Sequence, residues 1–319
     1  MLWWRFSLHL VRMSKKVRMF TTSEVRVGSP LSHARLSVFP LYTDQPTPAS
    51  YRLAGPALAD GTVVVEEATE GGNVPRLAVE NKGDRPVLFI EGEELRGAKQ
   101  NRVLNTSVLI GAGVRTVLPV SCVEQGRWRY TSKHFSPSQT GSSAKLRGVL
   151  KSSVSGSAKA GRGHGSDQSG VWSEVSRQMS SHGTSSATMA MSDTFTAAKK
   201  AVDEHLSHVG YPEGASGLAV AVGGKVVLVD LFDCPNTCRE VWPRLLSGAT
   251  MDALEADDAP APTETEVRDA ITAFRARGWE AVPAAGLGEE YRGEPDGKWH
   301  GSVLAKDGVV IHASLVTSS

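Results

Sequence analysis

Short apolar runs separated by turn residues fill the chain from Leu36 to Trp128. The runs are five to ten residues long, and apolar and polar side chains alternate within them, which is typical of antiparallel strands. Helical segments do not alternate with these runs, so a parallel βαβ fold is not expected. The pattern predicts an antiparallel, β-sandwich-like N-terminal half, with a partly open barrel as the alternative. Its β-rich part covers about 32–130, with strands in LSVFPLY, TVVVEEA, RLAVEN, PVLFIEG, RVLNTSVLI and RTVLPVSCVE.

Helical periodicity appears in the second half of the chain. The segment 192–210 carries apolar residues at helical spacing and ends at Gly210, where a C-terminal cap is expected. The segment 263–278 opens with Thr263 and Glu266 at the spacing of a capping box, so it predicts a second helix.

Two hairpins accompany these helices. Apolar strands flank Gly223-Gly224, and a second pair of strands flanks Asp307-Gly308. The part at about 171–319 is therefore predicted to hold antiparallel strands with packed helices. The fold class expected for the whole chain is α+β.

Two segments lack any such pattern. The Ser/Gly-rich stretch at about 151–170 has little apolar surface to offset the entropy of ordering, so it predicts a flexible insertion. The segment 1–20 is too short and too charged to span a bilayer. We expect a disordered basic extension there, or a start at Met13 or Met19, with a surface-lying anchor as the alternative. The rest, 21–319, is expected to form a single domain.

Composition excludes several classes of protein. The 319 residues can bury a substantial core. With 35 basic and 34 acidic residues, the chain has no overall field that would attract nucleic acid or an anionic membrane. We therefore expect no specific nucleic-acid partner and no membrane span. Three cysteines are too few for a disulfide framework and favour a cytoplasmic location. Composition leaves the oligomeric state open.

Two strands around Gly111-Ala112-Gly113 carry the candidate site. In the runs 103–110 and 114–120 the even positions are mostly apolar, while Asn105, Ser107 and Arg115 lie at odd positions, so the even face should point inward. A register centred on Ala112 sets Leu104 opposite Val120 and Arg102 opposite Cys122. It also sets Gln100 opposite Glu124, which predicts a polar cluster at the open end of an apolar face. A bulge of one residue would undo this register.

The same residues carry a resemblance to a known family. The blocks EGEELRGAKQNRVLNTSVLI and LPVSCVEQGRW resemble the ADP-ribosylglycohydrolase- and rhodanese/phosphatase-superfamily-associated protein domain. Weaker similarity continues through DQSGVW to the final strands, from roughly Val38 to Leu315. The resemblance implies one domain named for genomic neighbours that handle ADP-ribose and phosphate-bearing ligands, with no established reaction. The motif residues carried over are Glu93, Gly97, Gln100, Arg102, Cys122, Glu124, Arg127 and Trp128.

Three of these residues are candidates for catalysis. Cys122 precedes Arg127 by five positions, as the thiolate precedes the arginine in rhodanese-type loops, but no helix follows it. A buried, inert cysteine is the competing interpretation. Glu93 and Glu124 could act as a carboxylate pair in hydrolysis of a glycosidic bond. A structural ion pair with arginine is the alternative.

The remaining candidates would bind substrate. Arg102 and Arg127 suit bidentate capture of a phosphate, with pairing to Glu93 and Glu124 as the alternative. Gln100 and Asn101 are expected at the same opening. Trp128 could stack on an adenine or pack in the core. The cysteine and histidine spacings form no ligand set, so we expect neither a metal nor a cofactor.

Two functions remain possible. The first is a cytoplasmic enzyme that acts by acid–base hydrolysis on a phosphate-bearing, nucleotide-derived small molecule, linked to ADP-ribose or NAD metabolism. The second is a non-catalytic binding or sensor domain for the same ligands. The cluster of thiol, carboxylates and guanidiniums favours the enzyme, because it offers proton transfer as well as binding.

Overall fold

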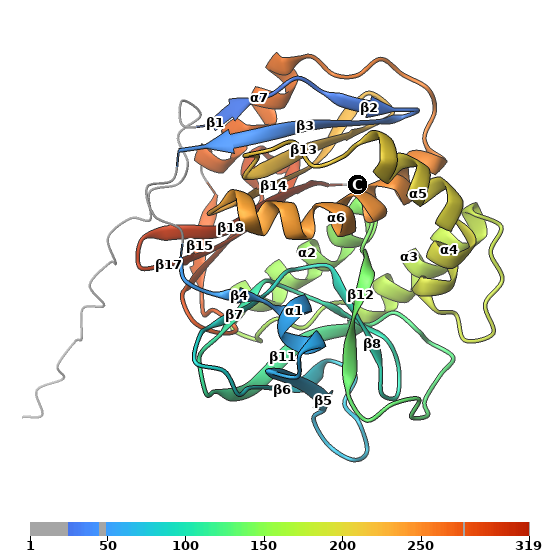
Figure 1. Cartoon of the computed structure of the whole chain (residues 1–319), viewed down its shortest axis with the longest axis vertical. Coiled ribbons are helices and arrows are strands. Elements are labelled where there is room, and N and C mark those ends of the chain that lie inside the picture. The colour runs from blue at the N-terminus through green and yellow to red at the C-terminus, as the bar shows by residue number, and fades with distance from the viewer. Residues whose placement is uncertain (1–24, 45–48, 277, 319) are drawn as a thin grey trace, which may run out of the picture.

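The computed structural model describes residues 25–44, 49–276 and 278–318. They form an α+β fold dominated by a nine-stranded antiparallel sheet (Figure 1). The expected α+β class is therefore confirmed. The extension 1–20 lies outside the described residues. The order in the large sheet is β1 (Val25–Val27), β3 (Leu36–Thr43), β13 (Gly217–Val222), β14 (Lys225–Phe232), β18 (Val309–Thr317), β17 (Trp299–Lys306), β16 (Glu289–Gly293) and β15 (Trp279–Val282), with β2 (Leu31–His33) paired to β3.

Two smaller sheets make the sandwich-like part of the molecule. They share one apolar core, to which almost every strand of both sheets contributes. One pair in the smaller sheet, β4 with β7, is parallel. The three-stranded sheet has the order β10 (Val108–Ile110), β7 (Val87–Phe89), β4 (Arg52–Leu53); the six-stranded sheet has the order β12 (Phe135–Gly141), β8 (Glu93–Gly97), β9 (Arg102–Leu104), β11 (Arg115–Cys122), β6 (Arg76–Asn81), β5 (Val63–Glu67).

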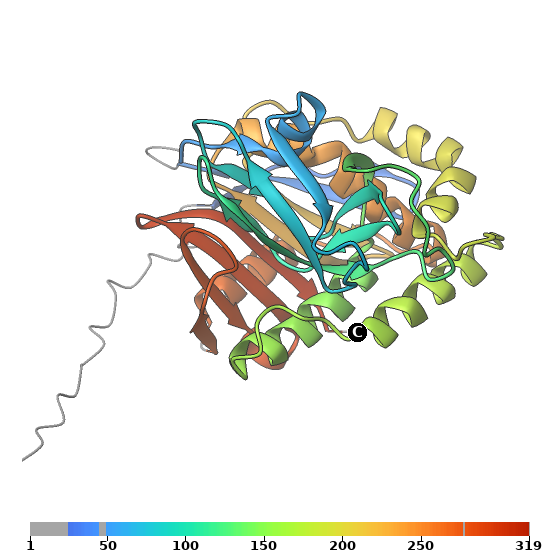
Figure 2. The same cartoon turned by 90° about the horizontal axis from the view of Figure 1, so that it is seen from below.

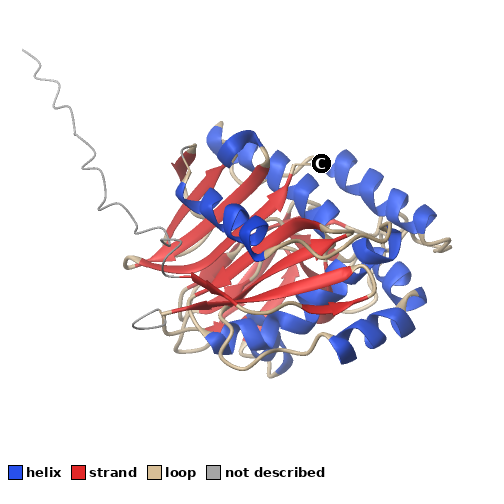
Figure 3. Ribbon diagram, turned by 90° about the horizontal axis from the view of Figure 1, so that it is seen from above, coloured by secondary structure: helices blue, strands red, loops and turns tan. Residues whose placement is uncertain are grey.

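Helices cover both faces of the large sheet (Figure 3). The segment α7 packs on one face through Val267 and Ile271, while α6 and α2 contact the other face. Because α6 also contacts β12, it lies between the large sheet and the sandwich-like part (Figure 1). The helices α3, α4 and α5 gather at one side of the molecule (Figure 2). The helical bounds are α1 (Ala54–Ala59), α2 (Ala144–Lys159), α3 (Gln168–Ser181), α4 (Met191–Ala197), α5 (Lys199–His208), α6 (Pro235–Glu255) and α7 (Glu264–Thr272).

Local signals in the C-terminal half predicted the structure well. The strands β13 and β14 turn at Gly223-Gly224, and β17 and β18 turn at Asp307-Gly308. All four turn residues have positive φ, which the tight hairpin turns require. The capping box of α7 is present, since Thr263 and Glu266 each accept a hydrogen bond from the other's backbone N–H. The helix expected at 192–210 is divided at Ala198 into α4 and α5.

The flexible insertion expected at about 151–170 was wrong at both ends, for 168–170, where α3 begins, and for 151–159. That stretch is the second half of α2, whose side facing the large sheet carries charged residues in addition to apolar ones. Arg147 and Lys151 lie one helical turn apart and form buried ion pairs with residues remote in sequence. Polar partners therefore stabilise a helix that hydrophobic periodicity alone does not reveal.

The buried carboxyl group of Asp252 links α6 to the start of α2. It accepts a hydrogen bond of 2.6 Å from the backbone N–H of Ala144, and burial raises its pKa to about 7. The folded state therefore holds a proton that the unfolded chain loses above pH ~3.9. As a result, this group makes the protein less stable as the pH rises from about 4 to about 7.

Asp252→Asn is expected to remove this pH dependence while keeping an oxygen that can accept the hydrogen bond. The free energy of unfolding should match wild type near pH 4 and exceed it by about 1–3 kcal/mol at pH 8. Urea unfolding at both pH values measures the difference. Asp257→Asn, at an exposed position, is the matched control and should change neither value. A variant of Asp252 that is less stable than wild type at pH 8 contradicts the assignment.

Candidate functional site

The register predicted around Arg102 and Cys122 is present. Strand β9 pairs with β11 so that Leu104 faces Val120 and Arg102 faces Cys122. The longer hairpin expected over 103–110 is wrong, because the chain leaves the sheet after Leu104 and reappears as β10 in the three-stranded sheet. The backbone N–H of Asn105 still donates to Pro119 of β11, but the side chains of Asn105, Thr106 and Ser107 bond to distant residues.

Arg102 and Cys122 are both fully buried. Arg102 donates 3.1 Å to the side-chain oxygen of Gln100, while its Nε and Nη2 have no hydrogen-bond partner among the described residues. Burial raises the pKa of the Cys122 thiol, and the positive charge of Arg102 opposes this only in part. A thiol in this state is a poor nucleophile, so the geometry supports the inert interpretation of Cys122.

Glu124 and Arg127 form a closed, bidentate ion pair. Arg127 donates from Nε (2.8 Å) and Nη2 (2.6 Å) to the two carboxylate oxygens of Glu124. The backbone N–H of Asn101 and the hydroxyl of Thr188 also donate to this carboxylate. Burial would raise the pKa of Glu124, but these hydrogen bonds outweigh it and lower the pKa. Glu124 is therefore an ionised anchor with both oxygens engaged.

Gln100 and Asn101 tie the same loops together. The amide nitrogen of Gln100 donates 2.9 Å to the backbone oxygen of Glu124. The side-chain oxygen of Asn101 accepts hydrogen bonds from Arg127 and from the backbone of Gly97. The structure thus brings Gln100, Asn101, Glu124 and Arg127 into one network at the ends of β8, β9 and β11.

A hollow of about 410 Å³ opens beside this network, and we call it the arginine pocket. Two exposed guanidiniums, Arg96 and Arg129, line it together with the buried Arg127. Hydroxyl groups and one further carboxylate, Asp193, complete the wall. The lining residues are Arg96, Gly97, Asn101, Glu124, Arg127, Arg129, Thr131, Ser132, Ser136, Thr188, Ala190, Ser192 and Asp193.

A second hollow of about 810 Å³ adjoins the arginine pocket, and we call it the tyrosine hollow. Thr131 and Ser132 line both cavities. Tyr130 contributes an exposed aromatic ring, and Glu67 lies deeper in the wall. The other lining residues are Glu66, Ala68, Thr69, Glu70 and Lys133.

Trp128 lies exposed beside these cavities and lines neither of them. The ammonium group of Lys99 lies 5.3 Å from the ring centroid of Trp128 and 5.1 Å from that of Tyr130. The packing expected of Trp128 in a core is not observed, since 48% of the residue is exposed.

Glu93 lies apart from the other candidates. It forms an ion pair with Arg244 of α6 and borders a small void between β8 and α6. Glu94 instead lies close enough to Glu124 for the charges to interact. Burial raises the pKa of Glu94, and Ser138 and Thr140 donate hydrogen bonds that only partly oppose this rise. The carboxylate pair expected from Glu93 and Glu124 is therefore not assembled.

A second polar cluster is fully buried against the large sheet. Arg292, Ser302, Ser314 and Asp230 are direct cross-strand neighbours on β16, β17, β18 and β14, and we call them the buried polar row. From α2, Arg147 donates to both oxygens of Asp230 at 2.6 and 2.8 Å.

Glu91 connects this row to the sandwich-like part. Lys151 lies 2.5 Å from its carboxylate, and Ser302 donates to the same group. Burial would raise the pKa of Glu91, but the charges of Lys151 and Arg147 outweigh it and lower the pKa to about 2. The side chain of His312 lies between Ser107 (2.7 Å) and Asp230 (3.1 Å). All of these groups are buried, so the arrangement supports the fold.

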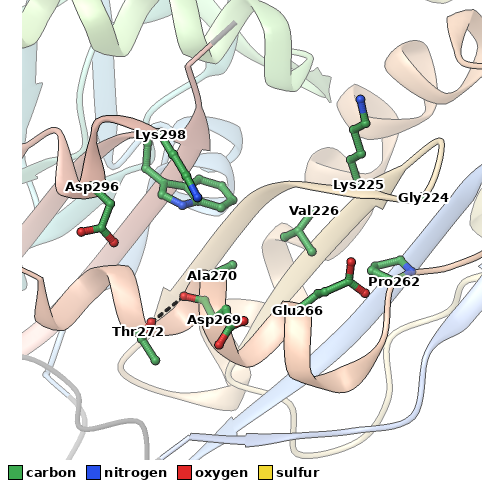
Figure 4. Close-up of a pocket in the computed structure, with 11 residues that line it drawn as sticks. Gly224, Lys225, Val226, Pro262, Glu266, Asp269, Ala270, Thr272, Asp296 and Lys298 are labelled. Atoms are coloured by element: carbon green, nitrogen blue, oxygen red, sulfur yellow. Dashed lines mark hydrogen bonds between the residues drawn. The ribbon is translucent and has the colours of Figure 1, made fainter.

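A further hollow of about 500 Å³ lies beside α7, next to the first residues of β14 and β17 in the large sheet (Figure 4). Figure 4 shows the carboxylates of Glu266 and Asp269 on α7, with Lys298 on a separate segment. This hollow contains none of the motif residues and mixes both signs of charge. It carries no defined chemistry.

Two other kinds of site are not found in the described part of the chain. No group of three or more His, Cys, Asp or Glu side chains there could hold a metal ion. No helix among the described residues is long and apolar enough to cross a membrane.

Sequence reasoning missed several residues of the arginine pocket. Arg96 lies within the first quoted motif and Arg129 directly follows the second, so their charge near Arg127 was an available signal. Thr188, Ser192 and Asp193 come from the segment leading into α4 and from α4 itself, more than sixty positions beyond Glu124. Only tertiary structure brings them to the site, through the backbone contact between Gly126 and Thr188.

The fold and this site define an α+β protein with an arginine-lined pocket where three sheet strands end. The chain belongs to the family of the ARG and Rhodanese-Phosphatase-superfamily-associated Protein domain, whose model matches residues 24–316. The resemblance noted in the motifs is thereby confirmed. The comparisons found no match among curated proteins and none among solved structures.

Proposed function

We propose that this domain binds a phosphate-bearing, nucleotide-derived small molecule in the arginine pocket. The observation that carries the proposal is the pair of exposed guanidiniums, Arg96 and Arg129, in a hollow of about 410 Å³. No ion pair engages either side chain among the described residues, so both are available to a phosphate. The association recorded in the family name fits a nucleotide-related ligand.

The arrangement supports binding better than catalysis. Arg127 supplies positive charge, but its guanidinium already donates hydrogen bonds to Glu124 and to backbone oxygens. Glu124 has both oxygens occupied and a lowered pKa, so it is poorly suited to donate a proton near neutral pH. Arg102 and Cys122 are fully buried and would support the pocket from behind.

Acid–base hydrolysis is the second candidate, and one observation favours it. Asp193 lines the arginine pocket together with Glu124, and among the described residues only one of its oxygens accepts a hydrogen bond, from Ser186. Two carboxylates beside a bound ligand are the arrangement that hydrolysis of a glycosidic bond requires. Product formation that Asp193→Asn abolishes, without loss of binding, would establish the enzyme.

Removing the two exposed guanidiniums is expected to weaken phosphate binding. The double variant Arg96→Ala/Arg129→Ala should bind ribose 5-phosphate at least about tenfold more weakly than wild type, measured by calorimetry, because charged hydrogen bonds contribute about 1.5–3 kcal/mol each. The matched control is Arg162→Ala, an exposed arginine outside both hollows. Equal affinity of the double variant and wild type, or no binding by wild type, refutes the proposal.

A further inference from the structure

We infer that the tyrosine hollow is a second subsite, which holds the heterocyclic base of a mononucleotide whose phosphate lies in the arginine pocket. This inference rests on the proposed function and narrows its ligand class. The two cavities measure about 810 and 410 Å³ and share Thr131 and Ser132 as a common wall. A ligand that reaches across this wall, with an anionic end and a second, bulky end, would occupy both.

Exposed aromatic rings indicate what that second end is. Among the described residues, the large apolar side chains that are exposed include only two aromatics, Trp128 (48%) and Tyr130 (50%). Both belong to the loop that separates the arginine pocket from the tyrosine hollow. An aromatic ring left in water at a cavity wall is suited to stacking on a planar base.

Charged groups hold this aromatic surface in place. The ammonium group of Lys99 lies within 5.3 Å of the ring centroids of both Trp128 and Tyr130 and donates 2.7 Å to the backbone oxygen of Glu70. The guanidinium carbon of the buried Arg102 lies 5.9 Å from the centroid of Trp128. These cation–π contacts engage both rings, and Tyr130 also lines the hollow.

The loop also depends on a close backbone approach at Gly97. A Cβ atom there would lie 2.4 Å from the hydroxyl of Ser132, one of the two residues that both cavities share. Ser132 donates to the backbone oxygen of His134 and accepts from the backbone of Ala98. The wall between the subsites is therefore built into the end of β8, so their relative position is defined in the unliganded chain.

Binding of AMP and ribose 5-phosphate tests the inference, because the two ligands share the phosphate and differ by the base. Calorimetry with the full chain should show AMP binding at least about tenfold more tightly than ribose 5-phosphate. Tyr130→Ala should remove most of this advantage and leave the affinity for ribose 5-phosphate unchanged. Tyr130→Phe keeps the ring and should retain the advantage.

The outcomes separate this inference from the proposed function. If ribose 5-phosphate and AMP bind equally, or if Tyr130→Ala leaves AMP affinity unchanged, the second subsite is refuted while the phosphate pocket stands. If wild type binds neither ligand, the proposed function fails as well. A short single-stranded oligonucleotide that binds far more tightly than AMP would replace the mononucleotide with a nucleic acid and overturn the inference.

Discussion

Asp230→Ala is expected to destabilise the folded chain by about 3–5 kcal/mol, because it leaves a buried guanidinium without its main partner. Arg147 donates two hydrogen bonds to Asp230, and both side chains are at most 1% exposed. The remaining carboxylate, Glu91, lies 3.7 Å from Arg147 and is already paired with Lys151. Urea unfolding at pH 7 measures the loss.

The free energy of unfolding measured at low pH provides a second test of the same ion pair. Burial would raise the pKa of Asp230, but Arg147 outweighs it and holds the pKa well below its usual range. A carboxyl group with a lowered folded pKa contributes stability above its unfolded pKa of ~3.9 and loses it as the pH falls further. The difference between wild type and Asp230→Ala should therefore shrink below about pH 4.

Two controls test whether burial is the cause. Asp203 on α5 pairs with Lys199 at 2.6 Å, but both side chains are more than half exposed. Asp203→Ala should change the free energy of unfolding by less than about 1 kcal/mol. Replacing both partners, as in Arg147→Met/Asp230→Leu, should recover much of the stability lost in Asp230→Ala. An Asp230→Ala variant as stable as Asp203→Ala would contradict the account.

The buried polar row also explains why part of the fold was hard to predict. Hydrophobic periodicity located the hairpins of the large sheet, since their signals lie within a few residues of each turn. The helix α2 was missed because Arg147 and Lys151 occupy core-facing positions, and their partners lie elsewhere in the chain. From the sequence alone, a buried charged residue whose partner is remote in the chain cannot be distinguished from a charged residue that is exposed to water.

At the candidate site, too, local features were predictable from the sequence and long-range contacts were not. The alternation of side chains on either side of Gly111-Ala112-Gly113 correctly predicted that Arg102 lies opposite Cys122. It did not reveal the break after Leu104, because the polar residues there bond to partners 59 to 205 positions away. The tight local spacing of Glu124 and Arg127 made their ion pair a foreseeable alternative, and the structure contains it.

Removing Glu124 or Arg127 is expected to cost nearly as much stability as removing both. Each single alanine variant leaves the other charge buried, since both side chains are 7% exposed. The double variant leaves no such charge. A double-mutant cycle on the free energy of unfolding should therefore give a coupling energy of about 2–3 kcal/mol.

The pair Glu264 and Arg268 on α7 provides the matched control, because it has the same charges in contact but lies on the surface, at 58% and 43% exposure. Its coupling should be about 0.3–0.5 kcal/mol, the value typical of exposed helix pairs. A coupling at Glu124 and Arg127 as small as this would mean that Arg127 is not committed to the carboxylate. Arg127 would then be free to bind phosphate itself, and the exposed Arg96 and Arg129 would no longer be needed to explain anion binding.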